Sequence, residues 1–200
     1  MESASGVKFE AELDREFAHW ATTVPGGENI RECIQCGACS GACPMSGYMD
    51  YTPRRIIALV REGFKEEVLS SRTIWLCASC YACAVECPQG INITDFMYAL
   101  KERAIKEGRY PKGFPTPIYA QEFAKLVRAR GRSTESLLVI RANLRLNPLK
   151  LLKFAPLGLK LLLRGRMRPS PRPEQVRDRA GVRAMLAASG GPKARHEHER

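Results

Sequence analysis

The sequence contains the stretch Cys33-Ile-Gln-Cys36-Gly-Ala-Cys39-Ser-Gly-Ala-Cys43-Pro44, and 44 residues further on it contains Cys77-Ala-Ser-Cys80-Tyr-Ala-Cys83-Ala-Val-Glu-Cys87-Pro88. Both stretches follow the pattern C-x2-C-x2-C-x3-C-P, and together they hold all eight cysteines of the chain. The pattern is therefore an internal repeat, and the spacers between its cysteines are rich in glycine, alanine and serine.

This cysteine spacing is the bacterial ferredoxin arrangement for cubane [4Fe-4S] clusters, in which three closely spaced thiolates bind one cluster and the fourth cysteine binds the other. The sequence predicts two such clusters with exchanged fourth ligands. Cluster 1 is assigned to Cys33, Cys36, Cys39 and Cys87, and cluster 2 is assigned to Cys77, Cys80, Cys83 and Cys43. Small residues between the ligands let backbone N-H groups approach the cluster sulfurs, which tunes the reduction potential.

Zinc and disulfide bonds are the other uses of clustered cysteines. Zinc also takes four thiolates, but its ribbons use paired CxxC motifs rather than a CxxCxxC triplet followed by Cys-Pro. Disulfides are rare in the reducing cytoplasm, and no secretory leader is recognisable in the acidic opening of the chain. We therefore expect iron-sulfur clusters and a cytoplasmic protein, with peripheral contact at the inner face of the membrane as a further option.

Charge divides the chain into two parts. Residues 1–108 carry 11 Lys+Arg and 15 Asp+Glu, a balance of −4, whereas residues 109–200 carry 21 and 6, a balance of +15. Glycine and proline residues, which interrupt helices, cluster at the boundary between the two parts, at Gly108 and in the segment 111–117. The predicted domains are an N-terminal amphipathic helix and linker (1–28), a two-cluster domain (29–108), a basic helical docking extension (109–168) and a flexible tail (169–200).

Apolar spacing predicts a mainly α fold, an α-helical ferredoxin-like dicluster domain between the N-terminal helix and the basic helical extension. The N-terminal helix is expected to carry Phe9, Leu13, Phe17 and Trp20 on one face. A second helix is expected to follow Thr52, which would cap it. A third helix is expected to follow Thr94 as its cap and to end at Gly108, with the side chain of Ile93 packed against Tyr98. Further helices are predicted near 117–130, 134–146 and 149–165.

In the last of these helices the cations Lys150, Lys153, Lys160 and Arg164 share one stripe among leucines, and Pro156 should kink the helix. The segment is too short and too charged to span a bilayer. Three roles stay open for it: docking on a partner subunit, packing on its own domain, or lying on an anionic membrane surface. Nucleic acid is not expected, because the extension has no aromatic residue after Phe154 and no DNA-reading motif.

The chain resembles the C subunit of heterodisulfide reductase and its bacterial relatives. The resemblance spans about residues 1–168 and includes Glu32 before the first cysteine loop, Tyr51-Thr-Pro-Arg-Arg55, Trp75-Leu-Cys77 and Asn147-Pro-Leu-Lys150. It implies an electron-transfer subunit with two [4Fe-4S] clusters between a flavin-bearing, HdrA-like subunit and a catalytic, HdrB-like subunit with CCG motifs. This chain has no CCG motif, so the resemblance implies no catalytic residue and no substrate-converting site in it.

Two other functions stay open at this point. The helical spacer between the cysteine loops is also similar to the iron-sulfur subunit of succinate or fumarate and quinone-linked oxidoreductases, although this chain lacks their preceding [2Fe-2S] domain. A protein of another class, in which the clusters sense redox state and the basic extension binds nucleic acid, is the second alternative.

Overall fold

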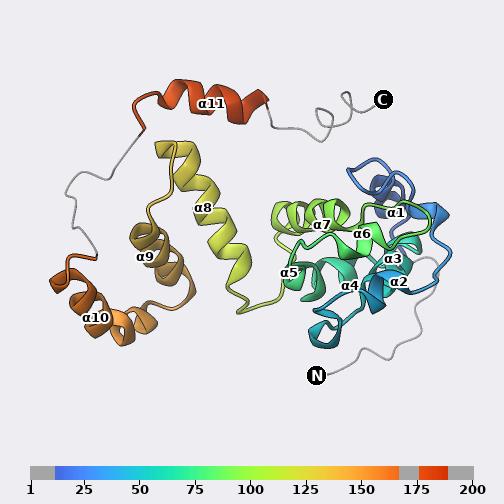
Figure 1. Ribbon diagram of the computed structural model, residues 1–200, viewed down its shortest axis with the longest axis horizontal. Helices are drawn as coiled ribbons and strands as arrows, with labels where there is room; N and C mark the ends of the chain where they lie inside the picture. Colours follow the sequence, from blue (N-terminus) through green and yellow to red (C-terminus); the bar gives the residue numbers. More distant parts are fainter. Residues whose placement is uncertain (1–11, 167–175, 189–200) are drawn as a thin grey trace. The chain divides into compact units, whose positions relative to one another are not determined.

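The computed structural model describes residues 12–166 and 176–188, and these residues contain helices and no β-strand. The chain divides into two compact units, Met1–Lys112 and Gly113–Arg200, which are described separately here (Figure 1).

Unit 1 contains nine helical segments within its described residues. The α-helices are α1 (Arg15–Ala21), α2 (Ala38–Gly41), α3 (Pro53–Arg61), α4 (Lys65–Leu69), α5 (Thr73–Leu76), α6 (Ala82–Val85) and α7 (Ile93–Glu107), and the 3-10 helices are η2 (Ile30–Glu32) and η3 (Ser46–Tyr48). Helices α4, α5 and α6 contact α7, the longest of them, while α1 and α2 contact α3. The two cysteine loops therefore sit on a helical framework built by α3 and α7.

The core of unit 1 is formed by the buried faces of α3 and α7. In α3 the buried residues include Ile56, Ile57 and Val60, and in α7 they include Phe96 and Leu100. This periodicity of three and four residues is that of an amphipathic helix. Met97, Leu100 and Ala104 are also buried in α7, and the predicted end of this helix at Gly108 is confirmed.

Of the two predicted helix caps, the position of Thr52 is confirmed and that of Thr94 is wrong. Helix α7 is capped by Asn92, whose side-chain oxygen accepts a hydrogen bond from the Asp95 N-H at 3.3 Å, whereas Thr94 lies buried inside the helix. The predicted contact of Ile93 with Tyr98 is not supported by burial, because Ile93 is buried and Tyr98 is 47% exposed. Thr52 occupies the cap position of α3 but its side chain makes no capping hydrogen bond. The Asn92 side-chain oxygen thus satisfies the N-H of the third helical residue, Asp95, as the cap of a helix does.

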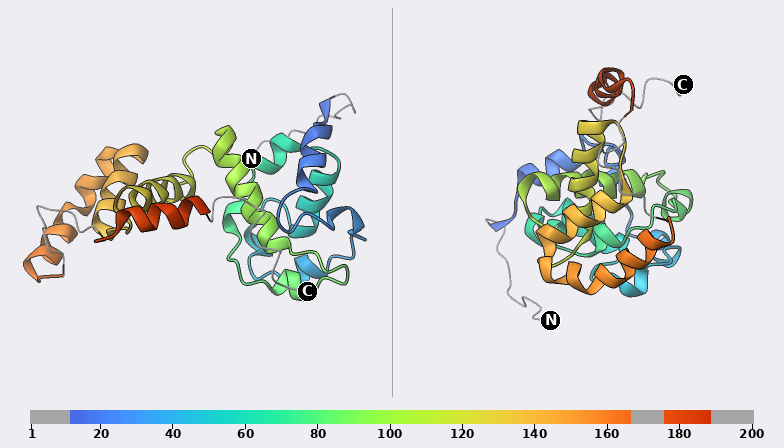
Figure 2. Two further views of the ribbon diagram at one scale, coloured as in Figure 1. Left: turned by 90° about the horizontal axis from the view of Figure 1, so that it is seen from above. Right: turned by 90° about the vertical axis from the view of Figure 1, so that its left-hand side faces the viewer.

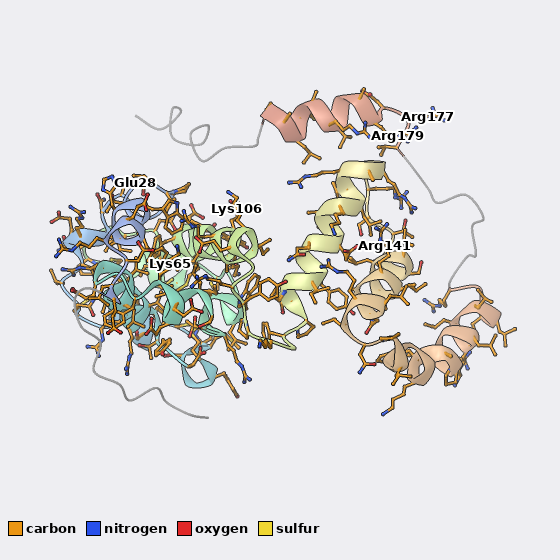
Figure 3. The ribbon with its side chains drawn as sticks, turned by 180° about the vertical axis from the view of Figure 1, so that it is seen from behind. Glu28, Lys65, Lys106, Arg141, Arg177 and Arg179 are labelled. Carbon is orange, nitrogen blue, oxygen red and sulfur yellow. The ribbon has the colours of Figure 1, made fainter. Side chains whose placement is uncertain are left out.

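Helix α1 begins at Arg15, where Asp14 caps it by accepting a hydrogen bond from the Phe17 N-H at 2.7 Å. Phe17 is buried as predicted, while the predicted core residue Phe9 lies outside the described residues. Lys65, labelled in Figure 3, pairs with Asp14 at 3.2 Å and with Glu107 at 3.1 Å. One lysine at the start of α4 thus ties together the beginning of α1 and the end of α7.

Unit 2 contains α8 (Thr116–Arg130), α9 (Glu135–Leu146), α10 (Pro148–Leu163) and α11 (Arg179–Ala188). Helices α8 and α9 lie side by side in both views of Figure 2, α10 contacts α9, and α11 contacts α8. Of the residues described in this unit, those that are buried are few: Pro117, Glu122, Leu126, Ala142 and Asn143. Its apolar core is therefore thin.

A buried carboxylate joins α8 to α9. The side chain of Glu122, 3% exposed, pairs with Lys125 at 3.2 Å, with Arg141 at 3.1 Å and with Arg145 at 2.8 Å; Arg141 is labelled in Figure 3. Burial alone raises the pKa of the Glu122 carboxyl, but the hydrogen bonds from Arg145 and Lys125 and the surrounding cationic charge outweigh it and hold the pKa below its ordinary value. The carboxylate is thus charged at neutral pH, and it neutralises part of the positive charge that Lys125, Arg141 and Arg145 bring to the pair of helices α8 and α9.

Helix α11 corrects the predicted flexible tail in part. The Asp178 carboxylate accepts a hydrogen bond from the Gly181 N-H at 2.8 Å at the start of this helix, and the Val176 N-H donates to the Arg130 carbonyl at the end of α8. This helix was not predicted, because proline and glycine residues on both sides of it favour an irregular segment, although Asp178 is a good cap residue. The rest of the predicted tail lies outside the described residues.

Two glycines bring the segment after α1 against α7. A Cβ atom on Gly27 would lie 1.8 Å from the Ala21 carbonyl oxygen, and one on Gly26 would lie 2.2 Å from the Asn92 oxygen. These are backbone atoms and they cannot move aside cheaply. We expect Gly27→Ala to lower the free energy of unfolding of unit 1 by about 3 kcal/mol, measured by chemical denaturation of the cluster-loaded protein.

Gly47→Ala is the matched control for this variant, because a Cβ on Gly47 would meet no atom within 4 Å. Equal stability of the two variants would contradict the close approach of Gly27 to the backbone at the end of α1.

Candidate metal centres

The two cysteine loops repeat one another in backbone conformation as well as in sequence. The left-handed region is occupied by Gln35 (φ 59°) and Gly37 (φ 87°) in the first loop, and by Ser79 (φ 57°) and Tyr81 (φ 60°) at the equivalent positions of the second. Each loop contains a short helix that holds its third cysteine, α2 with Cys39 and α6 with Cys83, and these two helices contact each other. The internal repeat of the sequence is therefore a structural repeat.

Tyr81 stands where the first loop has a glycine. A side chain in the left-handed region costs about 1 kcal/mol or more. The Tyr81 hydroxyl donates a hydrogen bond to the Asp95 carboxylate at 2.9 Å, which links the second loop to the first turn of α7. This tyrosine is 41% exposed, so an aromatic ring lies at the surface beside the second cysteine loop.

The thiols of each loop share a cavity with the last cysteine of the other loop. Cys33, Cys36 and Cys39 line one cavity together with Cys87. The second cavity is lined by Cys77, Cys80, Cys83 and Cys43. The open space is about 320 Å³ in the first and about 390 Å³ in the second. All eight cysteines are unbridged.

These surroundings fit two [4Fe-4S] clusters. Each cavity presents four thiols and is otherwise lined largely by small or apolar side chains, such as Ala38 and Ile57 in the first and Ala78 and Met97 in the second. The described residues contain no group of three His, Cys, Asp or Glu side chains placed to hold a single metal ion. A helical domain with two such four-thiol cavities is a two-cluster, ferredoxin-like iron-sulfur domain.

The third cysteine is buried in the first triplet, Cys39, and half-buried in the second, Cys83. Burial raises the pKa of the Cys39 thiol and of the Cys83 thiol, and neighbouring cysteines raise it further. Because thiols must lose their protons to bind metal, the iron supplies the positive charge that these sheltered sulfurs need. By contrast, the second cysteine of each triplet, Cys36 and Cys80, is exposed. Each cavity therefore has one solvent-facing thiol, and the first also has a buried one.

The first cavity has polar and cationic neighbours that the sequence analysis missed. The Gln35 amide donates a hydrogen bond to the Cys33 sulfur at 3.3 Å, and Arg61 donates to the Cys33 carbonyl at 2.7 Å. Arg54 lines the cavity and lies 3.5 Å from the Gln35 carbonyl. Both arginines come from α3, and the signal available in the sequence was their spacing of seven residues, two helical turns.

Among the described residues, none of those that line the second cavity carries a charged side chain. Its polar contact is with Thr94, whose hydroxyl lies 3.6 Å from the Cys83 sulfur. Thr94 thus lies beside the thiol of Cys83, whereas the sequence pattern predicted it as the cap of this helix. The approach to the loop is fixed by Asp50, which accepts hydrogen bonds at 2.8 Å from the backbone N-H groups of Arg72 and Thr73 at the start of α5.

The known proteins most informative for this site are iron-sulfur subunits. A family model described as a 4Fe-4S dicluster domain matches residues 29–91. The chain is 35% identical over 96 residues to the C subunit of the H(2):CoB-CoM heterodisulfide,ferredoxin reductase from Methanothermobacter marburgensis, which covers 48% of this chain and 51% of that protein. It is 38% identical over 93 residues to the C subunit of the ferredoxin:CoB-CoM heterodisulfide reductase from Methanosarcina acetivorans, covering 46% and 37%.

A third relative, the second iron-sulfur C subunit of the CoB-CoM heterodisulfide reductase from Methanocaldococcus jannaschii, is 32% identical over 109 residues, 54% of this chain and 58% of that protein. The chain thus spans about half the length of the curated relatives it matches. Within this shared half, the resemblance to the C subunits of heterodisulfide reductases is confirmed, and the chain is an iron-sulfur protein with a domain for two [4Fe-4S] clusters.

We propose the exchanged ligand sets given above for the two clusters, and the grouping of the thiols around the two cavities supports them. If they are correct, Cys87→Ser should damage the same cluster as Cys33→Ser, and Cys43→Ser should damage the same cluster as Cys77→Ser. Each variant should retain about half of the iron or convert one centre to a three-iron form, because one of four protein ligands is lost.

Mössbauer and EPR spectra of the four anaerobically purified variants test the grouping. A spectrum of Cys87→Ser that matches Cys77→Ser instead of Cys33→Ser would show that each loop binds its own fourth cysteine.

The cations at the first cavity predict unequal reduction potentials. Positive charge near a cluster favours its reduced form, and Arg54 lines only the first of the two cavities. The nearby Glu32 and Glu86 are exposed and do not line it. We expect Arg54→Gln to shift the equilibrium of cluster 1 toward the oxidised form by about three- to tenfold, ~30 to 59 mV for a one-electron couple, while Arg54→Lys shifts it less.

EPR-monitored redox titration measures this shift. Arg55→Gln is the control, because Arg55 lies on the same helix but over the Tyr51 ring, 5.3 Å from its centroid. An equal shift of the reduction potential in the Arg55 variant, or a shift of the potential of cluster 2 only, would contradict the prediction that the charge of Arg54 acts on cluster 1.

Proposed function

We propose that this chain is the electron-transfer subunit of a heterodisulfide reductase-like complex, relaying single electrons through its two [4Fe-4S] clusters between a flavin-bearing subunit and a catalytic subunit with CCG motifs. The observation that carries the proposal is the pair of four-thiol cavities, each with cysteines from both loops. A cubane cluster transfers one electron, so two adjacent cubanes form a short relay. The names of the relatives support the assignment to this kind of complex.

The relay needs an entrance and an exit at the surface. Beside the first cavity, Cys36 is exposed and Ile34 is 61% exposed. In the second loop, Cys80 is exposed, and Val85 on α6, two residues after Cys83, is 81% exposed. Exposed apolar side chains next to a solvent-facing ligand suit a protein interface through which electrons pass. We assign these two places, around Ile34 and around Val85, as the contacts with the two partner subunits.

The domain organisation follows the same division. The two-cluster domain (29–108) carries the electrons, and the extension that begins at residue 109 positions the subunit within its complex. We place the complex in the cytoplasm, at or near the inner face of the membrane. Among the described residues no helix combines the length and the apolar character needed to cross a bilayer.

The test is isolation of the native complex under anaerobic conditions from the cell that makes this chain. The chain should contain about eight iron atoms, from two four-iron clusters, and should co-purify with a CCG-containing chain and a flavin-binding chain. Stoichiometric zinc in place of iron, or co-purification with nucleic acid and no reductase subunit, would overturn the proposal.

The contact surfaces are tested in the same preparation. Ile34→Glu and Val85→Glu should each weaken binding of a different partner by about tenfold or more while leaving the iron content unchanged. Val139→Glu on α9, where Val139 is 44% exposed, is the matched control and should leave both partners bound. Loss of the same partner in both variants would contradict the assignment of one surface to each.

A further inference from the structure

Helix α10 exposes apolar side chains over most of its length. Among the residues of this helix whose burial is described, Gly158 and Leu161 are half-buried and the others are exposed. Its large apolar side chains are exposed to different degrees: Leu149 (70%), Phe154 (54%), Leu157 (54%), Leu159 (57%), Leu162 (39%) and Leu163 (79%). An apolar surface of this extent on one short helix marks a place where something else binds.

The polar side chains of the same helix all carry positive charge. No Asp or Glu occurs in the sequence from residue 147 to residue 166. Lys153, Lys160 and Arg164 lie within 120–160° of helical rotation from Pro148 and so form one stripe, with Leu159 and Leu162 rotated away from it. All three cations are exposed, and the salt bridges of the described residues do not include them. The helix thus combines a narrow cationic stripe with a wide apolar surface.

Unit 2 itself does not cover this surface. Helix α10 contacts α9, yet the buried apolar residues of the described part of this unit, such as Leu126 and Ala142, lie in α8 and α9. The neighbouring hairpin is already closed on itself by the Glu122 pairs. The exposed leucines of α10 are therefore free to meet an external surface.

We propose that α10 lies in the plane of an anionic membrane surface, with its leucines at the boundary between the headgroups and the acyl chains and its cations at the lipid phosphates. A wide apolar face with a lysine and arginine stripe is the pattern of interfacial helices. The 16 residues of α10 extend about 24 Å, less than the roughly 30 Å of the hydrocarbon core, so the helix lies on the bilayer instead of crossing it.

Charge complementarity favours lipid over a protein groove. A groove covers one face of a helix, but Leu157 lies on the cationic side of α10 and Leu162 on the opposite side, and both are exposed. A fluid interface accommodates both, because long cationic side chains extend to the phosphates while neighbouring leucines remain in the apolar layer. Anionic lipid also supplies negative charge along the whole stripe without a matching pattern of carboxylates.

The test uses the full chain with its clusters, purified anaerobically, and co-sedimentation with two kinds of vesicle. Binding to vesicles of phosphatidylcholine with phosphatidylglycerol should exceed binding to pure phosphatidylcholine by about tenfold or more, and should fall as salt is added. The charge variant Lys153→Gln/Lys160→Gln/Arg164→Gln should lose this preference for anionic lipid.

The apolar variant Leu159→Glu/Leu162→Glu should lose about tenfold or more of its binding to anionic vesicles. Leu144→Glu on α9 is the matched control, because Leu144 is 56% exposed outside α10, and it should bind like the unchanged chain. Iron content and circular dichroism show that each variant remains folded and loaded.

Equal binding to both kinds of vesicle, or equal loss in the Leu144 control, would overturn the proposal. So would a photo-crosslinker at position 159 that joins only a partner subunit in the native complex, since α10 would then be covered by protein. The vesicle experiment and the co-purification experiment are independent. If the chain does not prefer anionic vesicles, its co-purification with the reductase subunits is still expected. If it does not co-purify with them, its binding to anionic vesicles is still expected.

Discussion

Four thiols must converge on each cavity, and each cysteine triplet supplies only three of them. Cys87 follows the second triplet but lines the first cavity, and Cys43 follows the first triplet but lines the second. Neither cavity can be completed by one loop alone, so the helices between the loops must bring cysteines that are 34 to 54 positions apart in the sequence to one place. The framework of α3 and α7 meets this requirement, and the Lys65 pairs with Asp14 and Glu107 hold the ends of α1, α4 and α7 together.

The same framework makes the two cavities chemically different although their loops are alike. Helix α3 turns Arg54 toward the first cavity, while the described residues that close the second include Met45, Met49 and Met97 and no charged side chain. The loops differ too, because Gly37 adopts the left-handed conformation freely and Tyr81 adopts it at a cost that its bond to Asp95 offsets. The two copies of the repeated motif therefore lie in chemically unequal environments.

Much of this fold could be predicted from the sequence because metal-ligand spacing and helical periodicity are local. The repeat of the cysteines predicted the grouping of the thiols, and apolar spacing predicted α8, α9 and α10 to within two residues at each end. The neighbours of the cavities could not be predicted, since Arg54, Arg61 and Thr94 reach them only through the packing of α3 and α7. The caps were misjudged for a related reason: Asn92 and Thr94 are both good caps, and only tertiary burial of Thr94 decides between them.

The solvent-facing position of Cys36 and Cys80 has a consequence for the life of the subunit outside its complex. A cluster edge that lies close enough to the surface for an electron to leave toward a protein partner is equally close for dioxygen. Dioxygen could therefore damage the clusters between their insertion into this chain and assembly of the proposed complex, because no partner subunit covers them in that period. In the proposed complex, assembly would protect the clusters of this chain as well as connect them to their partners.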